Sequence, residues 1–182
     1  DAGASQILFG LSAVRNVGAG LVEFILEARD DGGPFEDFYD FCQRVNTQVL
    51  NKRTIESLIK AGGFDSMGHP RQGLLTVFEQ IVDATIARRK EHDMGVMSLF
   101  GEAEDGPAFD EKVKIPDVEF EKKQRLAFEK EMLGLYVSDH PLMGLEAALK
   151  RKAETTLAAL EDHEDGAFVA VGGVVTALQR KW

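Results

Sequence analysis

The residues best suited to chemistry in this sequence are two glycines, Gly18 and Gly20, which stand one residue apart between two short apolar patterns. Residues 11–22 read LSAVRNVGAGLV, which is a short helical turn, a tight turn, and then Gly-x-Gly at the start of a second helix. This order is typical of a helix–hairpin–helix. We expect Gly18 to supply a positive φ in the turn, and Gly20 to allow a close backbone approach.

The start of this second helix is suited to binding phosphate. The first N–H groups of a helix have no partner within the helix, and they lie at the positive end of its dipole. Such a site holds the DNA backbone without reading the bases. The alternative is a corner between two helices, in which the glycines serve only the turn. The predicted contacts are Asn16, Val17, Gly18, Ala19 and Gly20.

A second, weaker hairpin pattern follows. Asn51 is a suitable N-cap for a helix that runs to Lys60, a glycine-rich turn covers 61–68, and a further helix runs over about 70–89. The cations near this turn are placed to reach phosphates; the alternative is that they are simply solvated charges. The predicted DNA-binding residues of this unit are Lys52, Arg53, Gly68 and Arg71.

Apolar spacing predicts the elements that must position these residues. Residues 21–28 carry apolar side chains at i, i+3, i+4 and i+7, which is one face of a helix. Residues 35–45 repeat this spacing with an aromatic stripe, which we expect in the core. The further predicted elements are a linker or extended segment over 91–118, helices over about 120–135 and 144–161, and β-strands from Gly166.

Catalytic and metal-binding patterns are lacking in the sequence. Its histidines, His69, His92, His140 and His163, are scattered without the spacing of metal ligands. Cys42, the one cysteine, excludes an intramolecular disulfide and is expected to be a buried small apolar residue. No serine-nucleophile motif and no phosphate-binding P-loop occurs. We therefore expect neither an active site nor a metal in these residues.

Composition and charge restrict the class of protein further. With 44% hydrophobic residues, no basic and apolar leader and no apolar run of roughly 18 residues, we expect a cytoplasmic protein without a membrane span. The net charge of −10 discourages DNA binding, because phosphates need local lysine and arginine. Residues 1–92 carry only −3, which leaves room for a local basic face. A start at Asp1 and an end at Trp182, within a predicted strand, lead us to expect part of a longer protein.

Longer phrases of the sequence resemble the bacterial replicative DNA polymerase III alpha subunits. Residues 7–18 (ILFGLSAVRNVG) and 51–68 (NKRTIESLIKAGGFDSMG) resemble their tandem helix–hairpin–helix region. Residues 131–142 (EMLGLYVSDHPL) resemble the segment before their oligonucleotide-binding (OB) domain, and residues 166–182 resemble the first strands of that barrel. The resemblance implies a DNA-directed DNA polymerase as the parent chain. Its catalytic carboxylates and Mg²⁺ would belong to a palm domain, of which no motif occurs here.

The resemblance also implies a partner. Between its hairpin and OB domains, this family carries a short peptide that docks on the ring-shaped sliding clamp, typically Gln, two variable residues and then Leu-Phe. Met97, Ser98, Leu99 and Phe100 resemble its apolar end, and Val96 stands where the Gln is expected. Leu99 and Phe100 would be the hydrophobic anchors for a pocket of the clamp.

We therefore predict a mainly α chain that ends in the first strands of a truncated OB-type β-barrel. Its predicted function is to hold double-stranded DNA without sequence specificity, and to tether the polymerase, with its remaining domains, to the sliding clamp. The alternative is a helical protein–protein interaction module with purely structural hairpins. The predicted parts are a tandem helix–hairpin–helix domain (5–92), a linker with the clamp-binding peptide (93–119), a helical connector (120–165) and partial OB strands (166–182).

Overall fold

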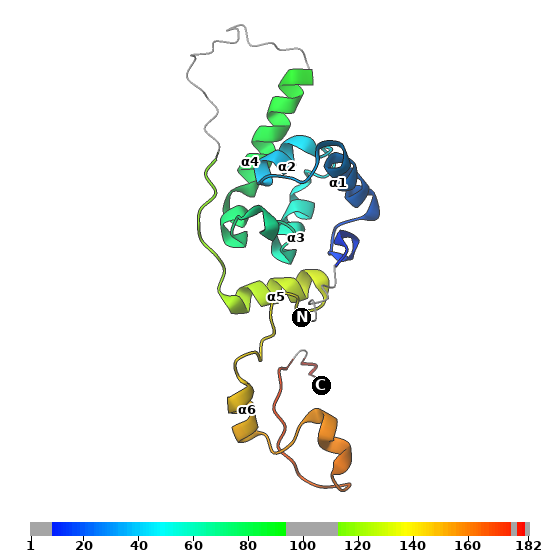
Figure 1. Cartoon of the computed structure of the whole chain (residues 1–182), viewed down its shortest axis with the longest axis vertical. Helices are drawn as coiled ribbons and strands as arrows, with labels where there is room; N and C mark the ends of the chain where they lie inside the picture. The colour runs from blue at the N-terminus through cyan, green and yellow to red at the C-terminus, as the bar shows by residue number, and fades with distance from the viewer. Residues whose placement is uncertain (1–8, 94–112, 176–177, 181–182) are drawn as a thin grey trace, which may run out of the picture. The chain divides into compact units, whose positions relative to one another are not determined.

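The structure is a computed structural model that describes residues 9–93, 113–175 and 178–180. It groups the chain into two compact units, Asp1–Leu135 and Tyr136–Trp182, so that the connector predicted over 120–165 is divided between them. No helix in the part of the chain that the structure describes is long and apolar enough to cross a membrane. With η for a 3-10 helix, the first unit contains η1 (Leu11–Ala13), α1 (Ala19–Gly32), α2 (Phe38–Arg44), α3 (Lys52–Ala61), η2 (Asp65–Met67), α4 (Arg71–Asp93) and α5 (Lys122–Leu133) (Figure 1).

Helix α3 begins and ends as local sequence signals predict. The side chain of Asn51 accepts hydrogen bonds from the N–H groups of Arg53 and Thr54, and it thereby caps the first turn. Gly62 ends the helix in the left-handed region, at φ 83°. Glu56 and Lys60 form an ion pair one turn apart, at 2.7 Å, as their spacing of four residues favours. These local predictions are confirmed.

The core of the first unit is built around the predicted aromatic stripe. The rings of Phe38 and Phe41 are buried, and each makes an edge-to-face contact with the ring of Phe64, at 5.1 and 4.9 Å between centroids. Cys42 is fully buried beside them, and burial raises the pKa of its thiol to about 12. Cys42 is therefore a small apolar core residue, as predicted, and its thiol stays protonated at neutral pH.

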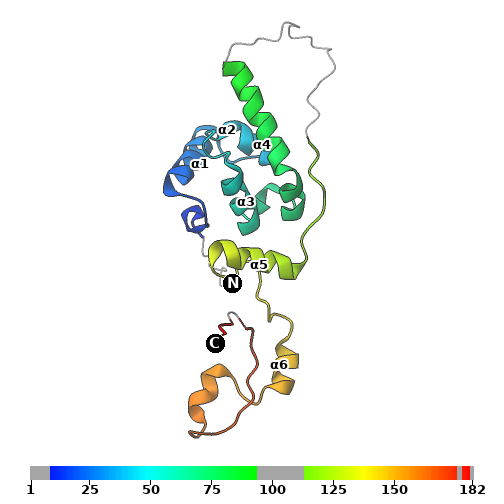
Figure 2. The same ribbon diagram turned by 180° about the vertical axis from the view of Figure 1, so that it is seen from behind.

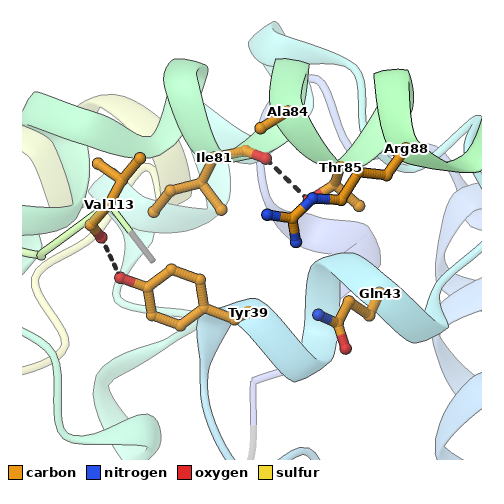
Figure 3. A pocket seen from close by; sticks show the side chains of 7 residues that line it. All are labelled: Tyr39, Gln43, Ile81, Ala84, Thr85, Arg88 and Val113. Carbon is orange, nitrogen blue, oxygen red and sulfur yellow. Dashed lines mark hydrogen bonds between the residues drawn. The ribbon is translucent and has the colours of Figure 1, made fainter. Parts of the chain in front are cut away.

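Residues 113–119, part of the predicted linker, lie in extended form against the start of α4. The N–H of Gly73 donates to the carbonyl of Val118 at 3.0 Å, and the Tyr39 hydroxyl donates to the carbonyl of Val113 (Figure 3). A Cβ atom on Gly73 would lie 1.9 Å from the carbonyl oxygen of Pro116. Helix α5 follows and packs against α3, which both views show (Figure 1, Figure 2).

The second unit contains α6 (Glu146–Lys152) and η3 (Leu157–Asp162), where the sequence predicted one helical stretch over 144–161. Among its described residues none is buried, and Phe168 and Val175 are largely exposed.

The strands predicted from Gly166 are not confirmed. Within the described residues of 166–182 the backbone forms no strand. The carbonyl of Ala170 accepts from the N–H of Glu154 at 2.8 Å, and the Glu154 carboxylate accepts from the N–H of Ala170 at 3.2 Å. An alternating pattern states which residues suit a strand, but a strand also needs a repeated ladder of main-chain bonds to a neighbour. These two contacts do not make such a ladder.

The close contact between Gly73 and Pro116 predicts that a larger residue at position 73 lowers stability. Gly73→Ala should lower the free energy of unfolding by about 1–3 kcal/mol, because the added methyl group must push residues 113–119 away from α4. Denaturant unfolding measures this. Gly20→Ala is the matched control, since a Cβ there meets nothing within 4 Å and alanine favours the helix. Equal unfolding midpoints for Gly73→Ala and the wild type would contradict the close packing of this segment.

Candidate nucleic-acid interface

The first hairpin differs from the prediction in which residue adopts the left-handed conformation. Gly18 is extended, with φ −80° and ψ 155°, and the positive φ of 66° belongs to Asn16. The predicted role of Gly18 in the turn is therefore wrong. The physical reason is that asparagine tolerates the left-handed region better than other residues with a side chain, so that it takes the conformation for which a glycine was expected.

Gly18 is instead the N-cap of α1. It has no side chain to bond the first turn, and the first turn of α1 carries no acidic residue. Gly18, Ala19 and Gly20 are exposed, and a Cβ atom on either glycine would meet nothing within 4 Å. Val17 is buried, so that its side chain anchors the hairpin to the core. The main-chain N–H groups at the start of α1 are therefore open to an anion.

The hairpin is bonded to α3 through Asn16. Its side-chain amide donates to the Ser57 hydroxyl at 3.0 Å, and its carbonyl accepts from the Thr54 hydroxyl at 3.4 Å. Ser57 in turn donates to the carbonyl of Arg53 at 2.8 Å. The amide of Asn16, predicted to contact DNA, is thus engaged within the protein. Thr54 and Ser57 lie among the buried apolar residues of α3, and buried hydroxyl groups require hydrogen-bond partners. This is the sequence signal by which they could have been recognised as the partners of Asn16.

Two exposed arginines adjoin this contact. Arg15 precedes Asn16, and Arg53, a predicted DNA-binding residue, precedes Thr54. Neither guanidinium makes an ion pair or a hydrogen bond with any residue that the structure describes. The main-chain N–H of Arg15 donates to the carbonyl of Met132 in α5 at 2.9 Å. Arg15 was missing from the predicted site, although a cation inside the hairpin turn was visible in the sequence.

Lys52 is placed differently from Arg53. Its ammonium group lies 2.9 Å from the Asp83 carboxylate and 3.0 Å from that of Glu79, both on α4. Hydrogen bonds to Asp83 and then to Glu79 raise the pKa of Lys52 above its ordinary value. All three side chains are exposed, so these ion pairs stabilise the fold little and can exchange with other partners.

The predicted role of Arg71 in DNA binding needs correction, because its side chain is buried. The guanidinium contacts Asp65 at 2.6 Å and the fully buried Glu129 at 3.0 Å. Burial lowers the pKa of Arg71, but hydrogen bonds and charges from Asp65 and Glu129 outweigh this and raise it. Because Glu129 lies 58 positions away along the chain, no local sequence pattern indicates this pairing.

In the second hairpin, unlike the first, the start of the helix is occupied by a side chain. Gly68 is exposed and left-handed, at φ 75°, and it ends η2. The first N–H of α4, that of Arg71, donates to the Glu119 carboxylate at 3.0 Å. The chain thus supplies its own anion where a phosphate was predicted. The two hairpins are not equivalent: the start of α1 is exposed, whereas the start of α4 is occupied by Glu119, and the Arg71 guanidinium is engaged by Glu129.

The predicted clamp-binding residues Val96, Met97, Ser98, Leu99 and Phe100 lie outside the described residues. Within the described residues, no group of three or more histidine, cysteine, aspartate or glutamate side chains could hold a metal ion.

Comparisons with known proteins found a matching family model and several similar proteins. A family model described as a helix-hairpin-helix motif matches residues 2–74. The DNA polymerase III subunit alpha of Mycobacterium tuberculosis strain H37Rv is 43% identical over 97% of this chain, and that of Saccharopolyspora erythraea is 42% identical over 97%. The subunit of Pseudomonas aeruginosa is 37% identical over 91%. The chain spans about 15% of the length of these relatives. The resemblance seen in the sequence is confirmed.

The buried ion pair between Arg71 and Glu129 predicts how substitutions of the two residues change stability. Arg71→Met should lower the free energy of unfolding by about 3–5 kcal/mol, because it removes the guanidinium that neutralises the buried Glu129 carboxylate. The double variant Arg71→Met/Glu129→Met should recover much of this loss. Denaturant unfolding compares the two, with Lys52→Met as a control that should change stability by less than about 0.5 kcal/mol. A loss in the double variant equal to or larger than that of Arg71→Met would contradict the pairing.

Proposed function

We propose that this chain, which is homologous to one segment of the DNA polymerase III alpha subunits, holds double-stranded DNA for a replicative polymerase. The contact is made by the first hairpin with backbone phosphates, and it is independent of base sequence. The remaining domains of the polymerase would supply catalysis, with Mg²⁺ bound there. The observation that carries the proposal is the exposed start of α1, which has no side-chain cap, together with the exposed Arg15 and Arg53, neither of which pairs with a residue in the described part of the chain.

The physics of this site suits phosphate and does not suit a base edge. Main-chain N–H groups at a helix start donate to phosphate oxygens, and the positive end of the helix dipole favours the negative charge. Arginine adds charge and releases counterions from DNA. Because the whole chain carries −10, we expect binding to depend on the local charge of Arg15 and Arg53, and the affinity should fall steeply with salt.

A substitution at Gly18 separates DNA binding from folding. Gly18→Asp places a carboxylate at the N-cap of α1, where it should bond the free N–H groups. The free energy of unfolding should stay constant or rise by up to about 1 kcal/mol. The affinity for duplex DNA should fall at least about tenfold, because the carboxylate both fills the site and repels phosphate. Fluorescence anisotropy with duplexes of two unrelated sequences measures this.

Gly18→Asn is the matched control, since asparagine caps the helix without adding charge. Its loss of affinity should be smaller than that of Gly18→Asp. A salt series adds a second test: Arg15→Gln with Arg53→Gln should lower the salt slope by about two, and the distant, exposed Arg29→Gln should not. A Gly18→Asp variant that binds DNA as tightly as the wild type would contradict the proposal. A wild type that shows no salt-dependent binding would favour the protein–protein interaction module.

We also propose that residues 96–100 tether the chain to a sliding clamp. What supports this is the sequence Val-Met-Ser-Leu-Phe, whose last two residues resemble the apolar anchors of the family's clamp-binding peptide. Burial of each anchor is worth about 1.5–3 kcal/mol. Val96 stands where the family peptide has a glutamine, so one polar contact is lost. We therefore expect a dissociation constant in the micromolar range, which corresponds to a binding free energy of about −8 kcal/mol.

The clamp proposal is tested by calorimetry with a purified bacterial sliding clamp. Leu99→Ala with Phe100→Ala should abolish measurable clamp binding and leave duplex binding unchanged, because the hairpin site is separate in sequence. Val96→Gln should strengthen clamp binding, since it restores the polar contact typical of the family. Unchanged clamp affinity in the double alanine variant would show that these residues are not the anchors.

A further inference from the structure

The hydrogen bonds that join Asn16 to α3 have a consequence for the hairpin. We infer that Asn16, Thr54 and Ser57 form a positioning contact, which fixes the direction in which the N–H groups at the start of α1 point. The second hairpin unit, to which α3 belongs, would then act by holding the first one in place. This inference rests on the proposed phosphate site and names the residues that orient it.

The contact has the features of an oriented polar bridge. The amide of Asn16 donates to the Ser57 hydroxyl, and that hydroxyl donates to the carbonyl of Arg53, so that each group in the series has a partner. Thr54 and Ser57 are buried on α3, whereas Asn16 is exposed. The bridge therefore ties an exposed turn to a helix whose own position is set by the core.

The backbone of Asn16 makes this bridge specific. Among the described residues it is the one non-glycine residue with positive φ. A turn in this conformation reverses the chain just before Val17 enters the core and Gly18 caps the start of α1. Holding both the amide and the carbonyl of Asn16 on α3 leaves the turn little freedom. Preorganisation of this kind lowers the entropy lost when a ligand is bound.

Both exposed arginines adjoin residues of this bridge in the sequence. Arg53 takes part through its carbonyl, and its side chain is exposed one residue before Thr54. Arg15 adjoins Asn16 on the other side of the contact and is held to α5 by its main-chain N–H. The second hairpin has its own helix start closed by Glu119, so α3 is expected to contribute through position and Arg53, without a phosphate site on α4.

The test is a double-mutant cycle in the full chain, with duplex affinity and thermal unfolding measured for each variant. Asn16→Gly keeps the left-handed turn accessible but removes the amide, and Ser57→Ala removes the acceptor. Each should weaken duplex binding by at least threefold, and the double variant should bind no more weakly than the weaker of the two. Thr85→Ala is the matched control: like Ser57, Thr85 donates to the carbonyl four residues earlier, here that of Ile81 within α4 (Figure 3).

A readout independent of DNA accompanies the cycle. In ¹⁵N-labelled protein without ligand, the amide resonances of Gly18 and Gly20 should shift in Asn16→Gly and in Ser57→Ala, and stay unmoved in Thr85→Ala. Because Asn16 is exposed, Asn16→Gly carries the test even where Ser57→Ala unfolds. Wild-type affinity in Asn16→Gly, losses that multiply in the double variant, or unmoved glycine amides would each overturn the inference. A wild type that fails to bind DNA would instead overturn the proposed function, while shifted amides would still support the positioning contact.

Discussion

The ion pair between Arg71 and Glu129 joins the first turn of α4 to the middle of α5, and both side chains are buried. Two charges are taken out of water at a large cost, so the arrangement is stable only while each partner is satisfied. Asp65 takes two further N–H groups of the same guanidinium, at 2.6 and 2.9 Å. The position of α5 on α3 therefore depends on a network that must be complete.

The position of the first hairpin follows from that of α5. The carbonyl of Met132, at the end of α5, accepts from the N–H of Arg15, and Asn16 is bonded to α3. Both helices that hold the turn are thus themselves joined through the second hairpin and its ion pair. The exposed helix start at Gly18 is therefore held in place by contacts with α3 and α5, and the buried ion pair fixes α5 in turn.

The start of a helix attracts an anion, and this property has different consequences at α4 and at α1. At α4 the anion is the Glu119 carboxylate, which fastens residues 113–119 across Gly73. At α1 no side chain in the described ranges caps the helix, and Gly18, Ala19 and Gly20 are exposed. Sequence repetition of a hairpin thus does not imply repetition of its function, because an internal carboxylate can occupy the place of an external phosphate.

Local chemistry was sufficient for much of the fold. The spacing of apolar residues located α1 to α5, and the caps at Asn51 and Gly62 depend only on residues a few positions apart. The sequence alone also identified the region around Gly18 and Gly20, because a Gly-x-Gly at a helix start is a short pattern. It misplaced the left-handed residue, since Asn16 and a glycine are both compatible with such a turn.

The tertiary structure decided which hairpin is open. The contacts that settle this join residues far apart in the chain: Arg71 with Glu129, Arg71 with Glu119, and Asn16 with Ser57, at separations of 58, 48 and 41 positions. No local pattern contains such pairings, because a charged or polar residue looks the same in sequence whether its partner is water, DNA or a distant carboxylate. Burial removed Arg71 from the surface, whereas Arg15 in the first hairpin turn and Arg53 on α3 stay exposed.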